Sequence, residues 1–341
     1  MISFKNKKEE MLESGPFANL WRVPTDNDEG GKNSFASEWR KAGLDSLELV
    51  SCAMRTEKVN THAYRVILKN VLKSQAGEVQ VHAVYTVYAT GDIHVKNTFT
   101  PEGNWPALAK VGLQLQMPAT FDKMQWFGNG PHETYSDRKM SGRVGQYSGT
   151  VASQHFPYIS PQENGNKTDV RWTTITNSDG IGLLAISDSL FNVNVHDYSD
   201  KELNASKKRG AVLARGNGTT VNLDLAQMGL GGDDSWSPRV HEKYRLPAKT
   251  YNYSFRLKAI DNSINLDETI HSTLPYLPGN SAVEESGEET SVVESDEKLE
   301  DEEEEIEKPA VRQKTAVRKK APVRKKAVAR KKTSKKKRRR R

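Results

Sequence analysis

Apolar and polar residues alternate over much of residues 47–257, in short segments that follow one another without long helical segments between them. A period of two residues is typical of strands that bury one face of a sheet. Strands that follow one another directly pair as antiparallel neighbours, because a parallel pair needs a long crossover connection. The pattern therefore predicts an all-β protein built from antiparallel sheets, and it excludes a parallel α/β fold.

The predicted strands are rich in Val, Ile, Tyr and Thr and end at Gly, Pro or Asp. They are residues 63–71, 78–89, 93–99, 107–117, 124–127, 170–176, 181–186, 193–196, 211–214, 219–226 and 251–257. Two short helices are predicted as well. One covers residues 33–43 and ends at Gly43, and the other begins at a capping box, Ser199 to Glu202, and ends before Gly210.

Residues 128–166 separate two groups of predicted strands. A connection of this length is usually functional or disordered. Many glycines and several rings predict that this one is ordered and packed. The side chains in it that could act in catalysis or binding are Glu133, Asp137, Arg138, His155 and Glu163. Glu133, Asp137, His155 and Glu163 are weaker candidates for a functional site, and the alternative is a lid whose charges pair with one another.

Residues 227–240 read Gln-Met-Gly-Leu-Gly-Gly-Asp-Asp-Ser-Trp-Ser-Pro-Arg-Val and follow a predicted strand. The glycines allow backbone angles that other residues avoid. A tryptophan ring beside two carboxylates suits a sugar, whose C–H face lies against the ring while its hydroxyls donate to the carboxylates. The alternative is a bend in which Asp233 and Asp234 bond local N–H groups and Trp236 packs in the core.

Residues 26–37 have the Asp-x-Asp spacing of a calcium-binding loop at Asp26 and Asp28. An EF-hand needs a glutamate at the twelfth position, and here that position is Ser37. The sequence therefore favours a turn in which the aspartates bond the backbone.

Charge is distributed unevenly along the chain. Residues 284–308 hold 14 acidic and 2 basic side chains, whereas residues 309–341 hold 18 basic and no acidic ones. Such single-sign runs bury too little apolar surface to offset the entropy lost on ordering. We therefore predict a folded domain, residues 1–276, and a disordered tail, residues 277–341.

The tail has two interpretations. It is either a solubilising extension whose acidic and basic halves neutralise each other, or its basic half binds a polyanion such as nucleic acid through phosphate contacts that weaken with salt.

The single cysteine, Cys52, excludes an intrachain disulfide and is expected to be a small buried hydrophobe. The N-terminal segment lacks the apolar region of a signal peptide, and the sequence has no apolar run of membrane-spanning length. We expect a soluble, cytoplasmic protein without membrane contact.

Four separated blocks resemble the C-terminal domain of the large glycoside hydrolase family 2 β-galactosidases. They are residues 15–30, 126–138, 158–165 and 228–238, and the resemblance covers about residues 1–260. It implies a β-supersandwich of the galactose-mutarotase type, with two large antiparallel sheets packed face to face. It also implies that Trp236 contacts the galactoside at the active site, while Gly231, Gly232, Asp233 and Asp234 hold the loop.

In that family both catalytic glutamates belong to a separate (β/α)₈ barrel, so the resemblance implies no catalytic residue on this chain. It also implies no metal site here, although the complete enzyme takes monovalent or divalent cations. The implied partner is a barrel-containing large chain, or N-terminal domains of the same enzyme. Two other functions stay open: a stand-alone carbohydrate-binding module, and a nucleic-acid-associated protein driven by its tail.

Overall fold

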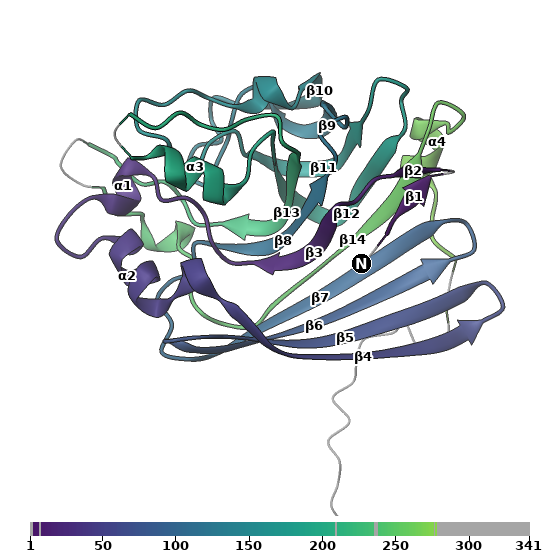
Figure 1. Ribbon diagram of the computed structural model, residues 1–341, viewed down its shortest axis with the longest axis horizontal. Helices are drawn as coiled ribbons and strands as arrows, with labels where there is room; N and C mark the ends of the chain where they lie inside the picture. Colours follow the sequence, from purple (N-terminus) through teal and green to yellow (C-terminus); the bar gives the residue numbers. More distant parts are fainter. Residues whose placement is uncertain (1–2, 7, 209, 235–237, 276, 278–341) are drawn as a thin grey trace, which may run out of the picture. The chain divides into compact units, whose positions relative to one another are not determined.

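The computed structural model describes residues 3–6, 8–208, 210–234, 238–275 and 277, which lie within a unit formed by Met1–Val283. Antiparallel strands dominate this part of the chain (Figure 1). The strands are β1 Lys5–Asn6, β2 Glu9–Glu10, β3 Ser14–Asn19, β4 Glu48–Asn60, β5 Ala63–Ser74, β6 Gly77–Tyr88, β7 Asp92–Gly103, β8 Lys110–Met117, β9 Lys123–Gly130, β10 Arg143–Thr150, β11 Lys167–Thr176, β12 Gly182–His196, β13 Thr219–Gln227 and β14 Tyr251–Ile260.

The helices are short and lie outside the sheet. They are α1 Asp26–Glu29, α2 Phe35–Ala42, α3 Asp200–Ser206 and α4 Leu266–His271, with 3₁₀ turns η1 Leu44–Ser46, η2 Ala152–Gln154 and η3 Glu242–Tyr244. No helix in the described part of the chain is long and apolar enough to cross a membrane.

The long strand β12 joins the two layers of the fold. On one side β12 pairs with β11, and on the other side its first half pairs with β14 and its second half with β13. From β14 the sheet continues through β7, β6 and β5 to β4, and from β13 it continues through β8 to β3. Figure 1 shows β3, β8 and β13 lying above β4 to β7. The predicted fold class is confirmed, and hydrogen bonds join its two layers into one curled, 12-stranded sheet.

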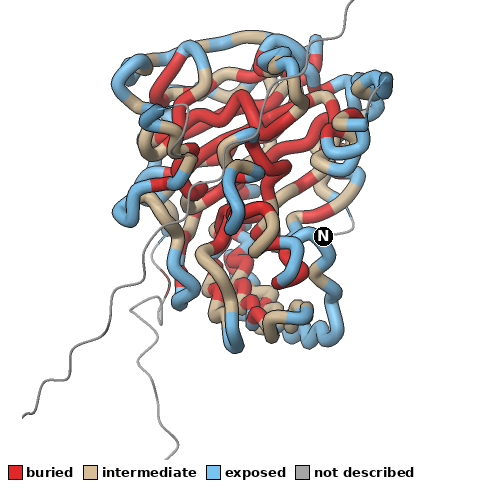
Figure 2. The backbone as a smooth tube through the Cα atoms, turned by 90° about the vertical axis from the view of Figure 1, so that its left-hand side faces the viewer, coloured by how far each residue is buried: buried red, intermediate tan, exposed pale blue. Residues whose placement is uncertain are grey.

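One large core fills the space between the layers. Alternate residues of β6 and β7 face alternate residues of β8 and β13, as in Val81, Phe99, Leu113 and Val221, all of which are buried. Figure 2 shows that buried residues follow the inner strands and that exposed ones follow the loops. The period of two that predicts the strands is therefore the pattern that fills this core.

Several predicted elements differ from the structure. Residues 211–214 form no strand, and the predicted strands 181–186 and 193–196 are parts of the single strand β12. The predicted strands also omit β3, β4 and β10. Glycines weaken the strand signal in β3 and β10. These strands form because a neighbour, β8, β5 or β9 respectively, supplies the backbone hydrogen bonds.

Residues 26–29 form the helix α1, where we predicted a turn. The Thr25 side chain accepts a hydrogen bond from the Asp28 backbone, and the Asp28 side chain accepts one from the Thr25 backbone. This reciprocal cap explains why aspartates with calcium-like spacing begin a helix instead.

The expected burial of Cys52 is wrong. Cys52 is exposed, because β4 is an edge strand on which no residue is fully buried.

Residues 128–166 are ordered and packed, as predicted, but they include the strand β10 and the turn η2. The predicted disordered tail, residues 277–341, with both charged halves, lies outside the described residues except for Leu277, which is buried with Ala63 and Tyr88.

Candidate functional site

The candidate site is the glycine corner, which we define as residues 227–240, where the chain leaves β13; residues 235–237 are not described. Gly231 and Gly232 have φ angles of +68° and +80°, in the left-handed region that favours glycine. A side chain at Gly231 would collide with the Pro238 carbonyl, and one at Gly232 with the Asn27 amide. The glycines therefore let the corner close tightly against α1.

Arg22 holds the first part of the corner from within the protein. Its guanidinium group is fully buried and pairs with Asp28, through Nε to Oδ2 at 3.1 Å and Nη2 to Oδ1 at 2.9 Å. It also donates to the carbonyl oxygens of Met228 and, at 2.9 Å, Gly229. Burial opposes the charge of Arg22, but the Asp28 carboxylate outweighs it and leaves the Arg22 pKa above its ordinary value.

Asp137 holds the next two residues. Its carboxylate accepts hydrogen bonds from the backbone N–H groups of Leu230, at 2.9 Å, and Gly231, at 2.8 Å. A Cβ atom at Gly229 would lie 2.5 Å from Asp137 Oδ2, so the glycine makes room for this carboxylate. The Asn27 side chain adds a bond of 3.1 Å to the Leu230 carbonyl. Asp137 therefore acts on the corner as a backbone clamp.

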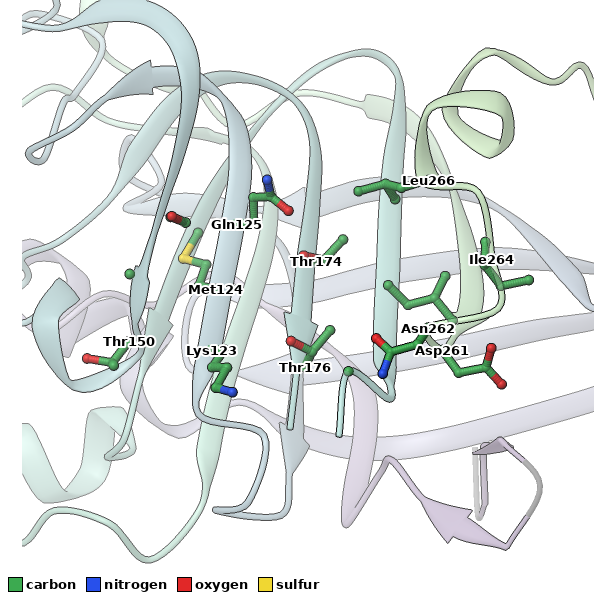
Figure 3. Close-up of a pocket in the computed structure, with 14 residues that line it drawn as sticks. Lys123, Met124, Gln125, Thr150, Thr174, Thr176, Asp261, Asn262, Ile264 and Leu266 are labelled. Atoms are coloured by element: carbon green, nitrogen blue, oxygen red, sulfur yellow. The ribbon is translucent and has the colours of Figure 1, made fainter. Parts of the chain in front are cut away.

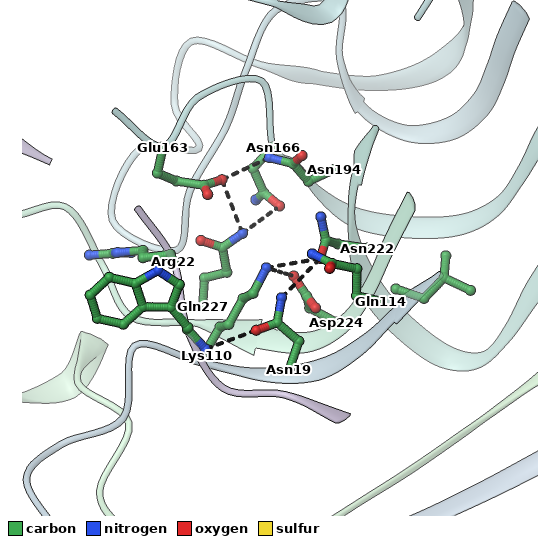
Figure 4. Close-up of polar contacts among 12 residues, drawn as sticks. Asn19, Arg22, Lys110, Gln114, Glu163, Asn166, Asn194, Asn222, Asp224 and Gln227 are labelled. Atoms are coloured by element: carbon green, nitrogen blue, oxygen red, sulfur yellow. Dashed lines mark hydrogen bonds and ion pairs between the residues drawn. The ribbon is translucent and has the colours of Figure 1, made fainter. Parts of the chain in front are cut away.

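Glu163 lies beneath the corner in a buried polar network (Figure 4). It is 5% exposed, and its Oε1 accepts from Asn194 at 2.7 Å and from Gln227 at 3.3 Å. Its backbone N–H donates to the Val23 carbonyl at 3.0 Å. Burial raises the pKa of Glu163 to about 7. Glu163 thus connects the start of the corner to the segment that contains Arg22.

The same network continues to a buried ion pair. Lys110 Nζ lies 3.6 Å from Asp224 Oδ2 and donates to Asn222 Oδ1 at 3.0 Å. Burial opposes the Lys110 charge, but Asp224 outweighs it and keeps the Lys110 pKa above its ordinary value. The side chains of Asn19 and Gln114 also donate to Asn222 Oδ1. Figure 4 shows these amides gathered around Lys110. The pair fixes β8 and β13 directly behind the corner.

Asp233 and Asp234 are exposed on the outer side of the corner. Asp233 Oδ2 lies 2.6 Å from His241 Nε2. Asp233 and His241 both line a cavity of about 360 Å³. Its other lining residues are Asp137, Arg138, Gly231, Gly232, Lys243 and Tyr244. The cavity therefore offers charged and polar groups directly beside the glycine-rich turn.

Glu133 and His155 line a neighbouring cavity, also of about 360 Å³, with Arg138 and Lys167. Glu133 accepts hydrogen bonds from the Tyr158 hydroxyl and, at 2.7 Å, from the Gly165 N–H. His155 Nδ1 lies 2.8 Å from the Tyr198 hydroxyl oxygen, and burial lowers the His155 pKa. Arg138 lines both cavities.

The structure thus brings Asp137 and Glu163 to the glycine corner, while Glu133 and His155 lie in the adjoining cavity. Trp236, the predicted sugar contact, lies outside the described residues. Sequence reasoning missed Arg22, Asn27, Gln227 and His241. Arg22 and Asn27 fall within the block 15–30, so the resemblance was the one available signal for them.

A further cavity, about 620 Å³, lies elsewhere, over β9 and β11 (Figure 3). Lys123, Gln125, Thr174 and Thr176 lie in two cross-strand rows along its floor. Ile264 and Leu266 line it from the segment that leads into α4. This groove is polar on one side and apolar on the other.

Comparisons with known proteins cover the same part of the chain. Residues 1–257 match the family model described as beta galactosidase small chain. The chain is similar to the β-galactosidase of Priestia megaterium, with 36% identity over 261 residues, 76% of this chain and 25% of that protein. It is 33% identical to the β-galactosidase of Vibrio cholerae over 247 residues, 70% of this chain and 23% of that protein. The chain therefore spans about a quarter of the length of these relatives.

Two solved structures are distantly similar. A putative aldose 1-epimerase from Escherichia coli has 10% identity and a TM-score of 0.36, over 76% of this chain and 91% of that chain. A GalM/aldose epimerase homologue from C. elegans has 10% identity and a TM-score of 0.30, over 74% and 82%. Because the family model matches most of the sequence, this chain belongs to the beta-galactosidase small chain family.

Proposed function

We propose that this chain is the part of a β-galactosidase that completes the active site for terminal β-D-galactosides. One observation supports the proposal above all: residues from four separate sequence blocks meet at the glycine corner. Arg22 and Asp137 bind its backbone, and Glu163 binds the side chain of Gln227 at its start. A corner held from three directions is a suitable mount for a side chain that must reach a sugar, because a rigid site spends less binding free energy on ordering.

In this proposal Trp236 lies against the apolar face of the galactoside or its aglycone. Gly231 and Gly232 provide the turn, while Asp233 and Asp234 hold the corner in place and Asp233 lines the cavity. An indole face suits the C–H face of a sugar, and carboxylates accept hydrogen bonds from sugar hydroxyls.

The reaction itself needs two carboxyl groups on opposite sides of the glycosidic bond, one as acid and the other as base or nucleophile. Asp137 is occupied by two backbone N–H groups, and Glu163 is buried among amides. Both therefore suit a positioning role. We infer that the catalytic glutamates belong to another part of the enzyme and that the isolated chain is inactive.

The test is galactoside hydrolysis by the full chain, alone and mixed with the part of the Priestia megaterium enzyme outside the matched region. We expect no turnover from either component alone and turnover from the mixture. Turnover by the chain alone, or none from the mixture, would refute the proposal.

A second candidate is a stand-alone carbohydrate-binding module. The groove on β9 and β11 favours it, because a polar floor and an apolar wall match the two kinds of sugar surface. Calorimetry with galactose and lactose on the chain alone distinguishes the two functions, since this candidate requires binding without a partner.

A further inference from the structure

Five large apolar side chains are exposed at the β4 edge of the sheet. Val50 is 50% exposed and lies at the register irregularity between Leu49 and Ser51. The other four, Leu49, Met54, Tyr64 and Val87, have exposed fractions of 56%, 68%, 51% and 38% and belong to β4, β5 and the end of β6. We call these last four residues the β4–β5 shelf.

The shelf lies on the face of the sheet that forms the core elsewhere. Residues directly opposite each other on neighbouring strands point to the same face. Leu49 is opposite Leu72 and Met54 is opposite Leu68. Leu68 and Leu72 both pack against the main core.

The other half of the shelf follows the same rule. Tyr64 is opposite Val87, and Val87 is opposite Ile93, which is buried in the core. All four side chains therefore point to the inner side of the sheet.

The other face of β4 and β5 carries more of the charge. Glu57 is opposite Arg65 and pairs with it at 3.0 Å, and Lys69 is opposite Ala53. Lys58, which is opposite Tyr64, is the one charged residue of β4 on the inner face. The apolar-in, polar-out pattern thus continues as far as the edge strand, although the second layer does not extend over it. A covered sheet face is apolar and a solvated one is polar. The exposed apolar side chains of β4 and β5 are therefore typical of a sheet face that another surface covers.

We propose that the β4–β5 shelf docks the part of the β-galactosidase polypeptide that carries the catalytic carboxylates. This inference rests on the proposed function. The chain spans 25% of the length of a relative, so in this proposal the rest of such an enzyme needs a docking surface on this chain. The four shelf residues include an aromatic residue and a methionine, the composition of an interface core, and Lys58 borders them opposite Tyr64. The matching partner surface is therefore largely apolar.

Two other occupants fit the shelf less well. A second copy would pair edge to edge, but β4 has irregular register at Leu49/Ser51 and Lys58/Asn60 and carries Arg55 and Glu57. Bulges and charges are the usual protection of an edge strand against such pairing. The tail, residues 284–341, consists mainly of charged residues and offers little apolar surface to cover the shelf.

The test uses the double variant Leu49→Ser/Met54→Ser of the full chain. Both side chains are more than half exposed, so the folded chain should tolerate the change. Val212→Ser is the matched control, because Val212 is 89% exposed and lies away from the shelf. The probe is the part of the Priestia megaterium enzyme outside the matched region. Binding is measured by calorimetry, activity by galactoside hydrolysis, and contact by hydrogen exchange of residues 48–72.

The double variant should bind the probe at least about tenfold more weakly than the wild type and the control, since two buried apolar side chains are lost. The probe should also slow exchange in residues 48–72 of the wild type. If the double variant binds the probe and supports galactoside hydrolysis like the wild type, the proposed docking surface is wrong and the proposed function stands. If the wild type neither binds the probe nor supports hydrolysis, the docking surface and the proposed function are both wrong. Self-association through the shelf, or protection of residues 48–72 that disappears when residues 284–341 are deleted, would assign the shelf to another occupant and overturn the inference.

Discussion

Arg22→Met should strongly destabilise the folded chain. The change removes a buried guanidinium group that binds the Asp28 carboxylate and the carbonyl oxygens of Met228 and Gly229. Methionine fills a similar volume, so the loss comes mainly from polar groups and not from a cavity. Asp28, which is 1% exposed, would be left as an unpaired buried charge.

Breaking a buried ion pair on one side costs about 3–5 kcal/mol. At about 2–4 °C per kcal/mol for a domain of this size, the melting temperature should fall by roughly 6–20 °C. Arg22→Lys should recover only part of the loss, because one ammonium group cannot reach Asp28 and both carbonyls with the geometry of a guanidinium fork.

Urea unfolding of the wild type and the variants measures these differences. Arg40→Met is the matched control, because Arg40 also pairs with a carboxylate, Glu29 at 2.5 Å, but with exposed fractions of 42% and 38%. An exposed pair contributes about 0–1 kcal/mol. If Arg22→Met costs no more than Arg40→Met, the guanidinium group does not hold the corner and the reasoning fails.

Three further predictions concern the corner, the network beneath it and the tail. Gly231→Ala should destabilise the chain more than Gly216→Ala, because both glycines have φ in the left-handed region but only Gly231 has a backbone carbonyl, that of Pro238, in the way; equal losses in urea unfolding would contradict this. Burial raises the pKa of Glu163 from 4.5 to about 7, so its contribution to stability is full below pH 4.5 and is lost as pH rises through about 7. The free energy of unfolding of the wild type should therefore fall by up to about 3 kcal/mol over that range relative to that of Glu163→Gln. If the two proteins show the same pH dependence of stability, Glu163 is not the group that titrates. If residues 309–341 bind polyanions, binding of a DNA duplex should weaken steeply with salt and disappear when these residues are deleted; binding that survives the deletion would exclude them.

The alternating pattern predicts most of the fold because packing of the core selects residues two apart, as in Val79, Val81 and Ala83 of β6. It fails where pairing with a neighbour overrides local preference. The strand β10 contains Gly145 and Gly149 and has no buried residue, so its sequence lacks the alternation of apolar and polar residues that predicts a strand. Residues 211–214 show the opposite failure, since they have strand-like residues and no partner strand.

Cys52 was misjudged for a related reason. Residue type alone favours burial, but burial depends on whether a second layer covers the strand, and β4 lies at an edge. That information is absent from any local window of sequence.

The glycine corner itself was visible in the sequence, but the contacts that support it were not. Arg22 lies more than 200 residues before the backbone groups that it binds, and Asp137 more than 90 residues before Gly231. No periodicity connects positions so far apart. The resemblance placed them in blocks of one family, and the structure adds what each side chain does there.

The most direct test of the whole account is the steady-state kinetics of galactoside hydrolysis by the reconstituted enzyme with Trp236→Ala. A stacking contact with the sugar predicts a rise in KM of about tenfold with a smaller change in kcat, since an aromatic contact contributes about 0.5–1.5 kcal/mol beyond the apolar area that it buries. Trp105→Ala is the control, because the Trp105 indole N–H donates to the Glu102 carbonyl, which is not part of the corner. If KM and kcat stay at their wild-type values in Trp236→Ala, the glycine corner does not present this tryptophan to the substrate.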